Sequence, residues 1–291
     1  MRYRPLGARG QVVSAVSLVL EPDSARRSAG DWVSLIYAAL ERGISGFEIR
    51  GSDPALGEGL AQAFSGMDRR LAFIALRMTG RRGKVLSFET VGAGVRDTLA
   101  RSGLGYLDAV LLSEPTVAEM PAVLELGALR SAGLVRALGV AGEGEGVDAL
   151  VACGEMDMLS TAYSLLSGWT ERRRLRSAVA ADMAVLGYGV YPRERLQPLT
   201  ERPAKHRAQP LAGVGGYAFL ERTKDWTAEE LCLAYALTEP SLATVLLRIQ
   251  SVEHLERLAA VPDRELPSAA AAQIEMARFS PQPEGPARRT A

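Results

Sequence analysis

Eight short apolar stretches recur along this chain, and each is followed by a segment with helical character. Their near-continuous apolarity is typical of parallel strands that are buried on both faces. We expect these strands at residues 16–20, 45–49, 71–78, 108–112, 137–140, 158–163, 184–188 and 244–247. Eight strand–helix units predict an α/β fold of the (β/α)8 TIM barrel type. A doubly wound sheet with a small second domain is the alternative fold.

Capping signals locate several of the helices between these strands. One helical segment begins at Asp31, a candidate N-cap, and ends at Gly43, a candidate C-cap. Another begins at Thr227, with Glu230 at the spacing of a capping box. A further helix is expected at 87–103, although its serine and glutamate are one residue short of that spacing.

Two regions depart from the alternation of strands and helices. Residues 192–226 are rich in Pro, Gly and charge, so we expect a lid or a disordered loop there. Beyond the last strand, one helical pattern at 268–279 precedes a tail that cannot bury much surface. We therefore expect a barrel domain over residues 1–261, and a C-terminal helix with a flexible tail over residues 262–291.

The charge balance and the apolar pattern exclude several classes of partner. The chain has 34 Lys+Arg and 34 Asp+Glu, so no net field attracts nucleic acid or an anionic membrane. No apolar run approaches the roughly 20 residues that cross a bilayer, and the basic start lacks the apolar segment of a signal peptide. We expect a small-molecule ligand, no nucleic acid and no membrane; the oligomeric state stays open.

The cysteines and histidines give no sign of a metal site. Cys153 and Cys232 stand in apolar helical contexts, which predicts buried thiols in a reducing, cytoplasmic compartment. His206 lies in the long loop and His254 near a helix start, and neither has a partner at metal-ligand spacing. We expect both histidines to be solvated and no metal to be bound.

Five segments carry a family resemblance. They are MRYRPLGARGQVVSAVSL at the start, RSAGLVRALGV (130–140), AYSLL (162–166), AVLGYGVYP (184–192) and TAEELCLAYALTEPSLATVLL (227–247). In this order the segments resemble those of the aldo-keto reductase superfamily, and the resemblance implies a divergent bacterial member. The resemblance covers residues 1–261. It implies a barrel closed at the bottom by an N-terminal β-hairpin, and carbonyl reduction with a bound nicotinamide cofactor.

The resemblance also implies where catalytic residues belong. The family uses Asp, Tyr, Lys and His at strand ends, with the tyrosine as general acid. Aligning its FDTAxxY pattern with FEIRGSD places Glu48 at the aspartate and Asp53 at the tyrosine, while Arg77 takes the lysine's place and Ser113 the histidine's. Glu48 and Arg77 keep opposite charges, so we expect an ion pair between them across the barrel mouth. Asp53 would be ionised at neutral pH and is a poor proton donor.

Most cofactor-binding positions of the family pattern are changed as well. The replacements are Ala141, Gly142, Thr161, Leu247 and Leu258. Tyr188 is kept and would stack on a nicotinamide ring, and Arg248 could still meet a phosphate. These changes favour the absence of a cofactor, with NADPH as the alternative.

Three functions remain open on this basis. The changed residues could form a polar pocket that binds a small metabolite or a partner without catalysis, as a binding or regulatory protein. The same pocket could perform non-redox acid–base chemistry with Glu48, Asp53 and Arg77. The chain could also be an NAD(P)H-dependent oxidoreductase with unusual active-site residues.

Overall fold

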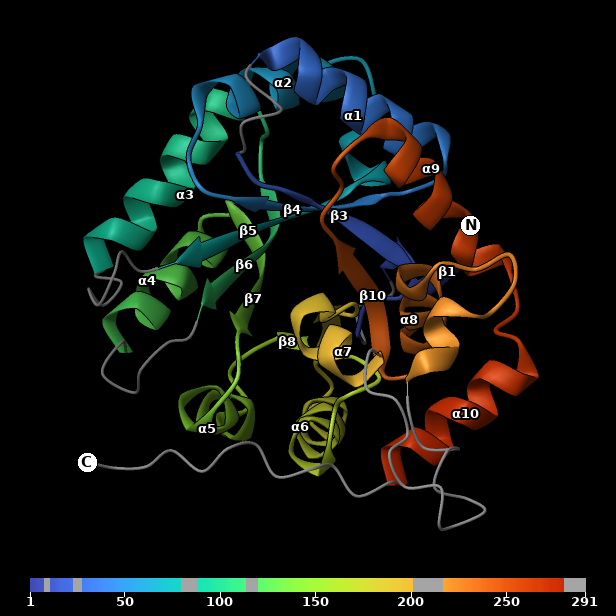
Figure 1. The fold of residues 1–291 in the computed structure, drawn as a ribbon. Coiled ribbons are helices and arrows are strands. Elements are labelled where there is room, and N and C mark those ends of the chain that lie inside the picture. Colours follow the sequence, from blue (N-terminus) through green and yellow to red (C-terminus); the bar gives the residue numbers. More distant parts are fainter. Residues whose placement is uncertain (8–10, 23–27, 80–87, 114–119, 201–216, 280–291) are drawn as a thin grey trace, which may run out of the picture.

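A closed barrel of parallel strands forms the centre of the protein. The computed structural model describes residues 1–7, 11–22, 28–79, 88–113, 120–200 and 217–279. Within them the strands close in the order β10-β3-β4-β5-β6-β7-β8-β9, with helices around the outside (Figure 1). The barrel strands are β3 (Val16–Leu20), β4 (Gly46–Arg50), β5 (Phe73–Thr79), β6 (Leu107–Ser113), β7 (Val135–Ala141), β8 (Met158–Ala162), β9 (Ala184–Tyr188) and β10 (Leu242–Leu247). Each overlaps one of the eight expected stretches, so the TIM barrel prediction is confirmed.

A short hairpin precedes the barrel, as the family resemblance implies. Strands β1 (Tyr3–Pro5) and β2 (Val12–Ser14) pair antiparallel. The backbone N–H of Ala15 bonds back to Arg2, and that of Val245 in β10 bonds to Ala15. These bonds attach the hairpin to the N-terminal end of the barrel.

The helices lie where the alternation predicts them. They are α1 (Ala29–Glu41), α2 (Pro54–Phe64), α3 (Phe88–Ser102), α4 (Met120–Ser131), α5 (Glu145–Cys153), α6 (Trp169–Ala180), α7 (Arg193–Thr200), α8 (Ala228–Ala236), α9 (Val252–Ala260) and α10 (Ser268–Phe279). Short 3-10 turns occur at Arg69–Leu71, Ala218–Glu221 and Val261–Asp263. No helix in the described ranges is both long and apolar enough to span a membrane.

The helix caps confirm one prediction and correct another. In α8 the Thr227 side chain accepts from the N–H of Glu230, whose carboxylate accepts from the Thr227 N–H, as expected. In α1 the N-cap is Ser28 and not Asp31. Asp31 lies three residues inside and completes a capping box, because its carboxylate accepts from the Ser28 N–H. Gly43 follows the C-cap with a positive φ of 77°, which favours glycine.

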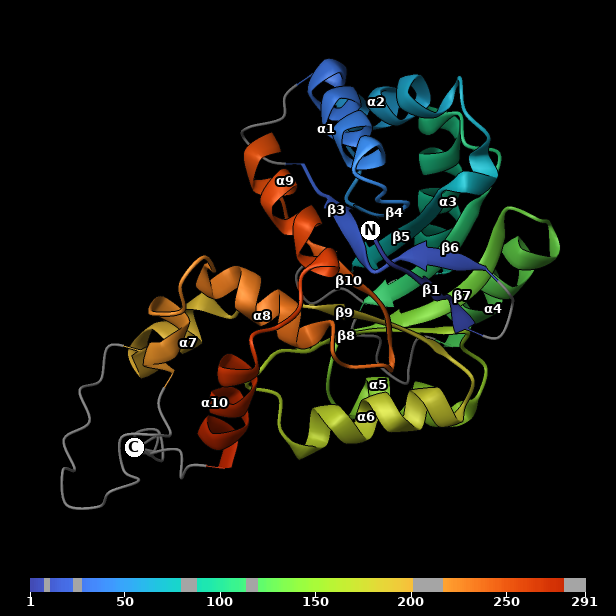
Figure 2. The same ribbon diagram turned by 90° about the vertical axis from the view of Figure 1, so that its right-hand side faces the viewer.

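The region expected to be a long loop contains regular structure. Helix α7 occupies its start and the 3-10 turn Ala218–Glu221 lies near its end, so the prediction of a loop throughout was wrong. Residues 201–216, where a lid would lie, are outside the described residues, as are Ser87 and the tail 280–291. Helix α10 confirms the predicted C-terminal helix and packs against α8 in a separate apolar cluster (Figure 2).

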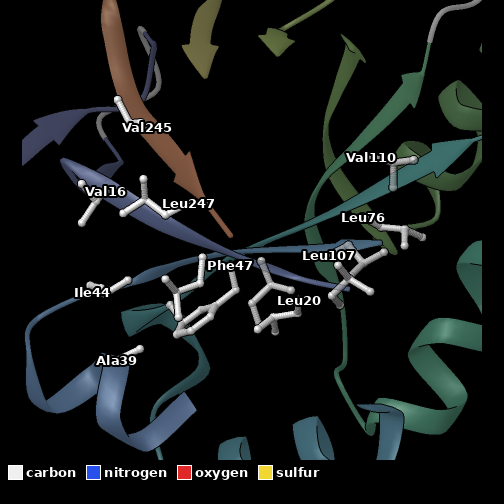
Figure 3. Packing of buried hydrophobic residues seen from close by; sticks show 14 of the residues in the cluster. Val16, Leu20, Ala39, Ile44, Phe47, Leu76, Leu107, Val110, Val245 and Leu247 are labelled. Atoms are coloured by element: carbon white, nitrogen blue, oxygen red, sulfur yellow. The ribbon is translucent and has the colours of Figure 1, made fainter. Parts of the chain in front are cut away.

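Two apolar clusters divide the barrel into an outer and an inner core. The outer cluster joins the strands to the helices: Figure 3 shows Phe47 of β4 beside Ile44, with Ala39 of α1 close by. The inner cluster consists mainly of strand residues such as Ala75 and Leu111. The residues that follow this cluster toward the C-terminal strand ends form the surface of the barrel mouth.

One cysteine prediction was wrong. Cys232 is buried in α8 as expected, but Cys153, the last residue of α5, is exposed. Helix α5 is amphipathic and its buried face is formed by Val147 and Val151. A residue two positions beyond Val151 lies on a different face of the helix, which explains the exposure.

Candidate functional site

Membership of the inner or the outer core cluster shows which side chains point into the barrel. Val19 and Ala75 belong to the inner cluster and are the Cα partners of Glu48 on the two neighbouring strands. Partners in register point to the same face of a sheet, so Glu48 faces the interior, where it is completely buried. Side chains alternate with a period of two along a strand. Arg50, the last residue of β4, therefore faces the interior too.

Three further polar side chains reach the interior by the same alternation. Arg77 follows Ala75 by two residues, and Ser113 follows Leu111 by two. Tyr188, the last residue of β9, packs against the inner cluster directly. All three lie at or near the C-terminal ends of their strands, where TIM barrels form their sites. The structure thus places these residues at the mouth, as the alignment predicted.

Glu48 makes its ion pair within its own strand. Its Oε1 lies 2.5 Å from Nε of Arg50, whose side chain is 14% exposed. The expected ion pair between Glu48 and Arg77 does not form, and that prediction was wrong. The physical reason is the spacing along the strand. Residues two apart point to the same face, so the guanidinium of Arg50 lies next to the Glu48 carboxylate and pairs with it in place of Arg77. Glu48 Oε2 and Arg50 Nη2 are buried and have no hydrogen-bond partner among the described residues.

Arg77 is held by a serine and a tyrosine. Its Nε and Nη2 donate to Ser113 Oγ at 3.3 and 3.2 Å. Its guanidinium carbon lies 5.0 Å from the centroid of the Tyr188 ring, within the range of a cation–π interaction. Three strands, β5, β6 and β9, therefore fix the position of one positive charge inside the mouth.

Two arginines stand next to each other at this end of the barrel. Arg50 and Arg77 are Cα partners in the β4–β5 register, so their side chains leave the sheet on the same face. Glu48 is the acidic group in hydrogen-bond contact with this pair, and it engages Arg50 alone. The alignment did not identify Arg50, because it stands at the alanine of the FDTA pattern. Its spacing of two from Glu48 was the signal that could have identified it.

Asp53 has a structural role in the fold. It is the N-cap of α2, and its Oδ1 accepts a hydrogen bond of 2.9 Å from the backbone N–H of Leu56. Pro54 at the first helical position completes a favourable helix start. The carboxylate thus satisfies a backbone donor of its own helix.

The positions expected to hold a cofactor are occupied in other ways. Arg248 is exposed and its Nη2 lies 2.7 Å from a carboxylate oxygen of Glu21. Thr161 is completely buried, and its hydroxyl has no hydrogen-bond partner in the described part of the chain. Ala141 is buried beside Ser113 in the β6–β7 register and offers no side-chain donor.

His254 is not solvated, contrary to the sequence-based expectation. It is 8% exposed; its Nδ1 accepts from the N–H of Gln250 and its Nε2 lies 3.0 Å from Glu229. These contacts tie the start of α9 to α8. His206 lies outside the described residues, and the described ranges contain no group of three metal-ligating side chains.

Comparison with known families connects this barrel to a protein class. The model of the aldo/keto reductase family matches residues 45–278, which includes the strands that carry Glu48, Arg77 and Ser113. The chain belongs to the aldo/keto reductase family. No curated protein sequence matches it.

Solved structures of an aldo/keto reductase share the fold. The holo form of aldo-keto reductase AKR11C1 from Bacillus halodurans superposes with a TM-score of 0.73 at 18% identity, covering 94% of this chain and 95% of that one. The apo form of the same protein gives a TM-score of 0.70 at the same identity and coverage. At this identity the likeness shows the barrel and its topology.

Proposed function

We propose that this aldo/keto reductase family member binds a small anionic metabolite at the barrel mouth and does not reduce carbonyls with a nicotinamide cofactor. The observation that carries the proposal is the adjacency of Arg50 and Arg77 on one inner face, with Glu48 as the contacting counter-charge. Paired guanidinium groups are suited to carboxylates and phosphates, which they bind through parallel hydrogen bonds.

Charge balance supports an anionic ligand. Arg50 forms an ion pair with Glu48. The described contacts of Arg77, by contrast, are with neutral groups, a hydroxyl and an aromatic ring. A positive charge that is partly removed from water and lacks a carboxylate partner is costly. An anionic group placed against Arg77 would offset that cost, and Arg50 Nη2 has an unused donor one strand away.

The residues present do not fit the chemistry of carbonyl reduction. The family places a tyrosine as proton donor where this chain has Asp53, and that carboxylate is engaged in capping α2. A capping carboxylate accepts hydrogen bonds in its ionised form. It is therefore a poor acid for protonating a developing alkoxide.

The residues also fit a dinucleotide poorly. Arg77 lies near the ring of Tyr188, which the family pattern assigns to nicotinamide stacking, and Arg248 is paired with Glu21. Ala141 and Gly142 lack the side-chain groups with which the family pattern would hold a carboxamide. Each missing charged or polar contact weakens binding by about tenfold or more.

Acid–base chemistry on the bound metabolite is the second candidate. The observation in its favour is Glu48 Oε2, a buried carboxylate oxygen without a hydrogen-bond partner among the described residues. Such an oxygen can accept a proton from a ligand held by the arginines. This candidate depends on the same anion site and adds a base to it.

Ligand binding to matched variants tests the proposal. A panel of small carboxylates and organic phosphates is screened by thermal shift, and each hit is measured by calorimetry on the parent protein, Arg77→Met, Arg50→Met and Arg176→Met. Arg176 is an exposed arginine of α6 and serves as control. We expect Arg77→Met to abolish binding with the fold intact, and Arg176→Met to bind as the parent does. Equal binding by Arg77→Met refutes the assignment, as does loss of the fold, because Arg77 is then structural.

A further inference from the structure

A cavity lies at the opposite end of the barrel from the mouth. It has a volume of about 530 Å³ and lies between the N-terminal hairpin, the C-terminal end of α8 and the start of α10. In Figure 1, β1, α8 and α10 all lie on the right-hand side of the molecule. Its charged lining consists of Arg2, Arg4, Arg264 and Glu265. Three arginines against one glutamate leave an excess of positive charge.

Arg4 is fixed in the wall of this cavity. Its Nη1 donates to the carbonyls of Glu239 and Leu242 at 3.2 and 2.7 Å, and its Nη2 donates to the carbonyl of Leu237. These bonds hold the guanidinium below the end of α8, but they come from neutral groups. Within the described chain, Arg4 has no carboxylate within ion-pair distance.

Arg2 adds a second charge close to the first. Burial lowers the pKa of Arg4 and the positive charge of Arg2 lowers it further, whereas the carboxylate of Glu239 opposes the shift without cancelling it. Arg2 is exposed, and in the described ranges its guanidinium makes no hydrogen bond or ion pair. The chain therefore places two like charges together at a cavity where, among the described residues, no carboxylate forms an ion pair with either guanidinium. A bound anion would stabilise this arrangement.

Arg264 differs from these two because it is already paired. Its Nη1 lies 3.5 Å from Glu230, its Nη2 donates to the carbonyl of Asp225, and its guanidinium stacks on Trp226 at 3.6 Å. This arginine forms part of the rigid wall. The arginines of the cavity that have no ion-pair partner among the described residues are thus Arg2 and Arg4.

The remaining lining is suited to the body of an organic molecule. Leu237 and Leu266 supply apolar surface, while Ser268 and Thr238 supply hydroxyl groups. We propose that this cavity binds a small organic anion, whose carboxylate or phosphate group contacts Arg2 and Arg4 and whose apolar body lies against the leucines. The site is separate from the mouth and does not depend on the function proposed for it.

Calorimetric titration of the full-length protein with phenyl phosphate, at fixed ionic strength, tests this site. We expect saturable binding that weakens about tenfold in Arg2→Gln and further in Arg2→Glu, since each change removes or reverses a charge-assisted contact. Arg2 is exposed, so both variants should fold, which circular dichroism verifies. Arg176→Gln is the matched control and should bind as the parent does.

Two comparisons complete the test. The binding of phenyl phosphate that is weakened in Arg2→Gln should be unchanged in Arg77→Met, because the two arginines lie at opposite ends of the barrel. Inorganic phosphate should bind more weakly than phenyl phosphate, because it buries no apolar surface. The proposal is overturned if the parent shows no saturable binding at millimolar phenyl phosphate, if both Arg2 variants bind like the parent, or if inorganic phosphate binds equally well.

Discussion

The carboxylate of Glu48 and the guanidinium of Arg50 lie 2.5 Å apart inside the barrel, on one strand and two residues apart in sequence. The pair is almost removed from solvent, with side chains 0% and 14% exposed. It leaves Arg77, on the next strand, without a carboxylate partner among the described residues. The internal pairing of β4 thus determines the charge that the mouth offers to a ligand.

The stability of the protein should depend on both members of this pair. Glu48→Gln leaves Arg50 buried without its counter-charge beside Arg77, which should lower the free energy of unfolding by about 3–5 kcal/mol. Replacing both residues, as Glu48→Leu with Arg50→Leu, should cost much less, because no unpaired charge remains. Urea unfolding of the two variants measures the difference. A single variant as stable as the parent would show that the two groups do not form a buried pair in solution.

The role of Asp53 as a helix cap predicts how its variants behave. Asp53→Ala should lower the free energy of unfolding by about 1 kcal/mol, whereas Asp53→Ser should retain most of the stability. Both variants should bind any mouth ligand as the parent does, because the carboxylate serves α2. Thermal unfolding and calorimetry provide the two readouts. If Asp53→Ser is stable but no longer binds the ligand, Asp53 contributes to ligand binding and is not only a helix cap.

The alternation of apolar stretches was enough to predict the barrel. All eight strands were placed correctly because parallel strands buried on both faces leave a strong signal. The contacts within the mouth were harder to predict. An alignment shows which residue occupies a position but does not rank competing partners, and it directed attention to Arg77 when Arg50 lay closer to Glu48. The helix α7 was missed since Pro and charge around Arg193–Thr200 are also typical of loops.

Alkaline pH should destabilise the protein through Cys232. Burial raises the pKa of this thiol, and the nearby charge of Glu229 raises it further. A raised pKa in the folded state gives stability that is complete below the ordinary thiol pKa and is lost as pH rises toward the folded value. Above pH 9 the unfolded state loses the proton first, so the free energy of unfolding should fall by about 1.4 kcal/mol per pH unit.

Denaturant unfolding between pH 7 and 10 measures this dependence. Cys232→Ala serves as the comparison, since it removes the titrating group at the cost of a small cavity. It should lower stability at pH 7 and flatten the decline above pH 9. If parent and variant decline with the same slope, the alkaline loss comes from other groups.

This aldo/keto reductase family member is proposed to bind an anion at Arg50 and Arg77 without a nicotinamide cofactor. Titrating the folded protein with NADPH, and following protein and nicotinamide fluorescence, tests it most directly. We predict no saturable change at micromolar NADPH, since the contacts missing around Tyr188 and Arg248 would together weaken binding by several powers of ten. Tight, saturable quenching that is lost in a Tyr188→Ala variant would contradict the claim and establish a nicotinamide site at the barrel mouth.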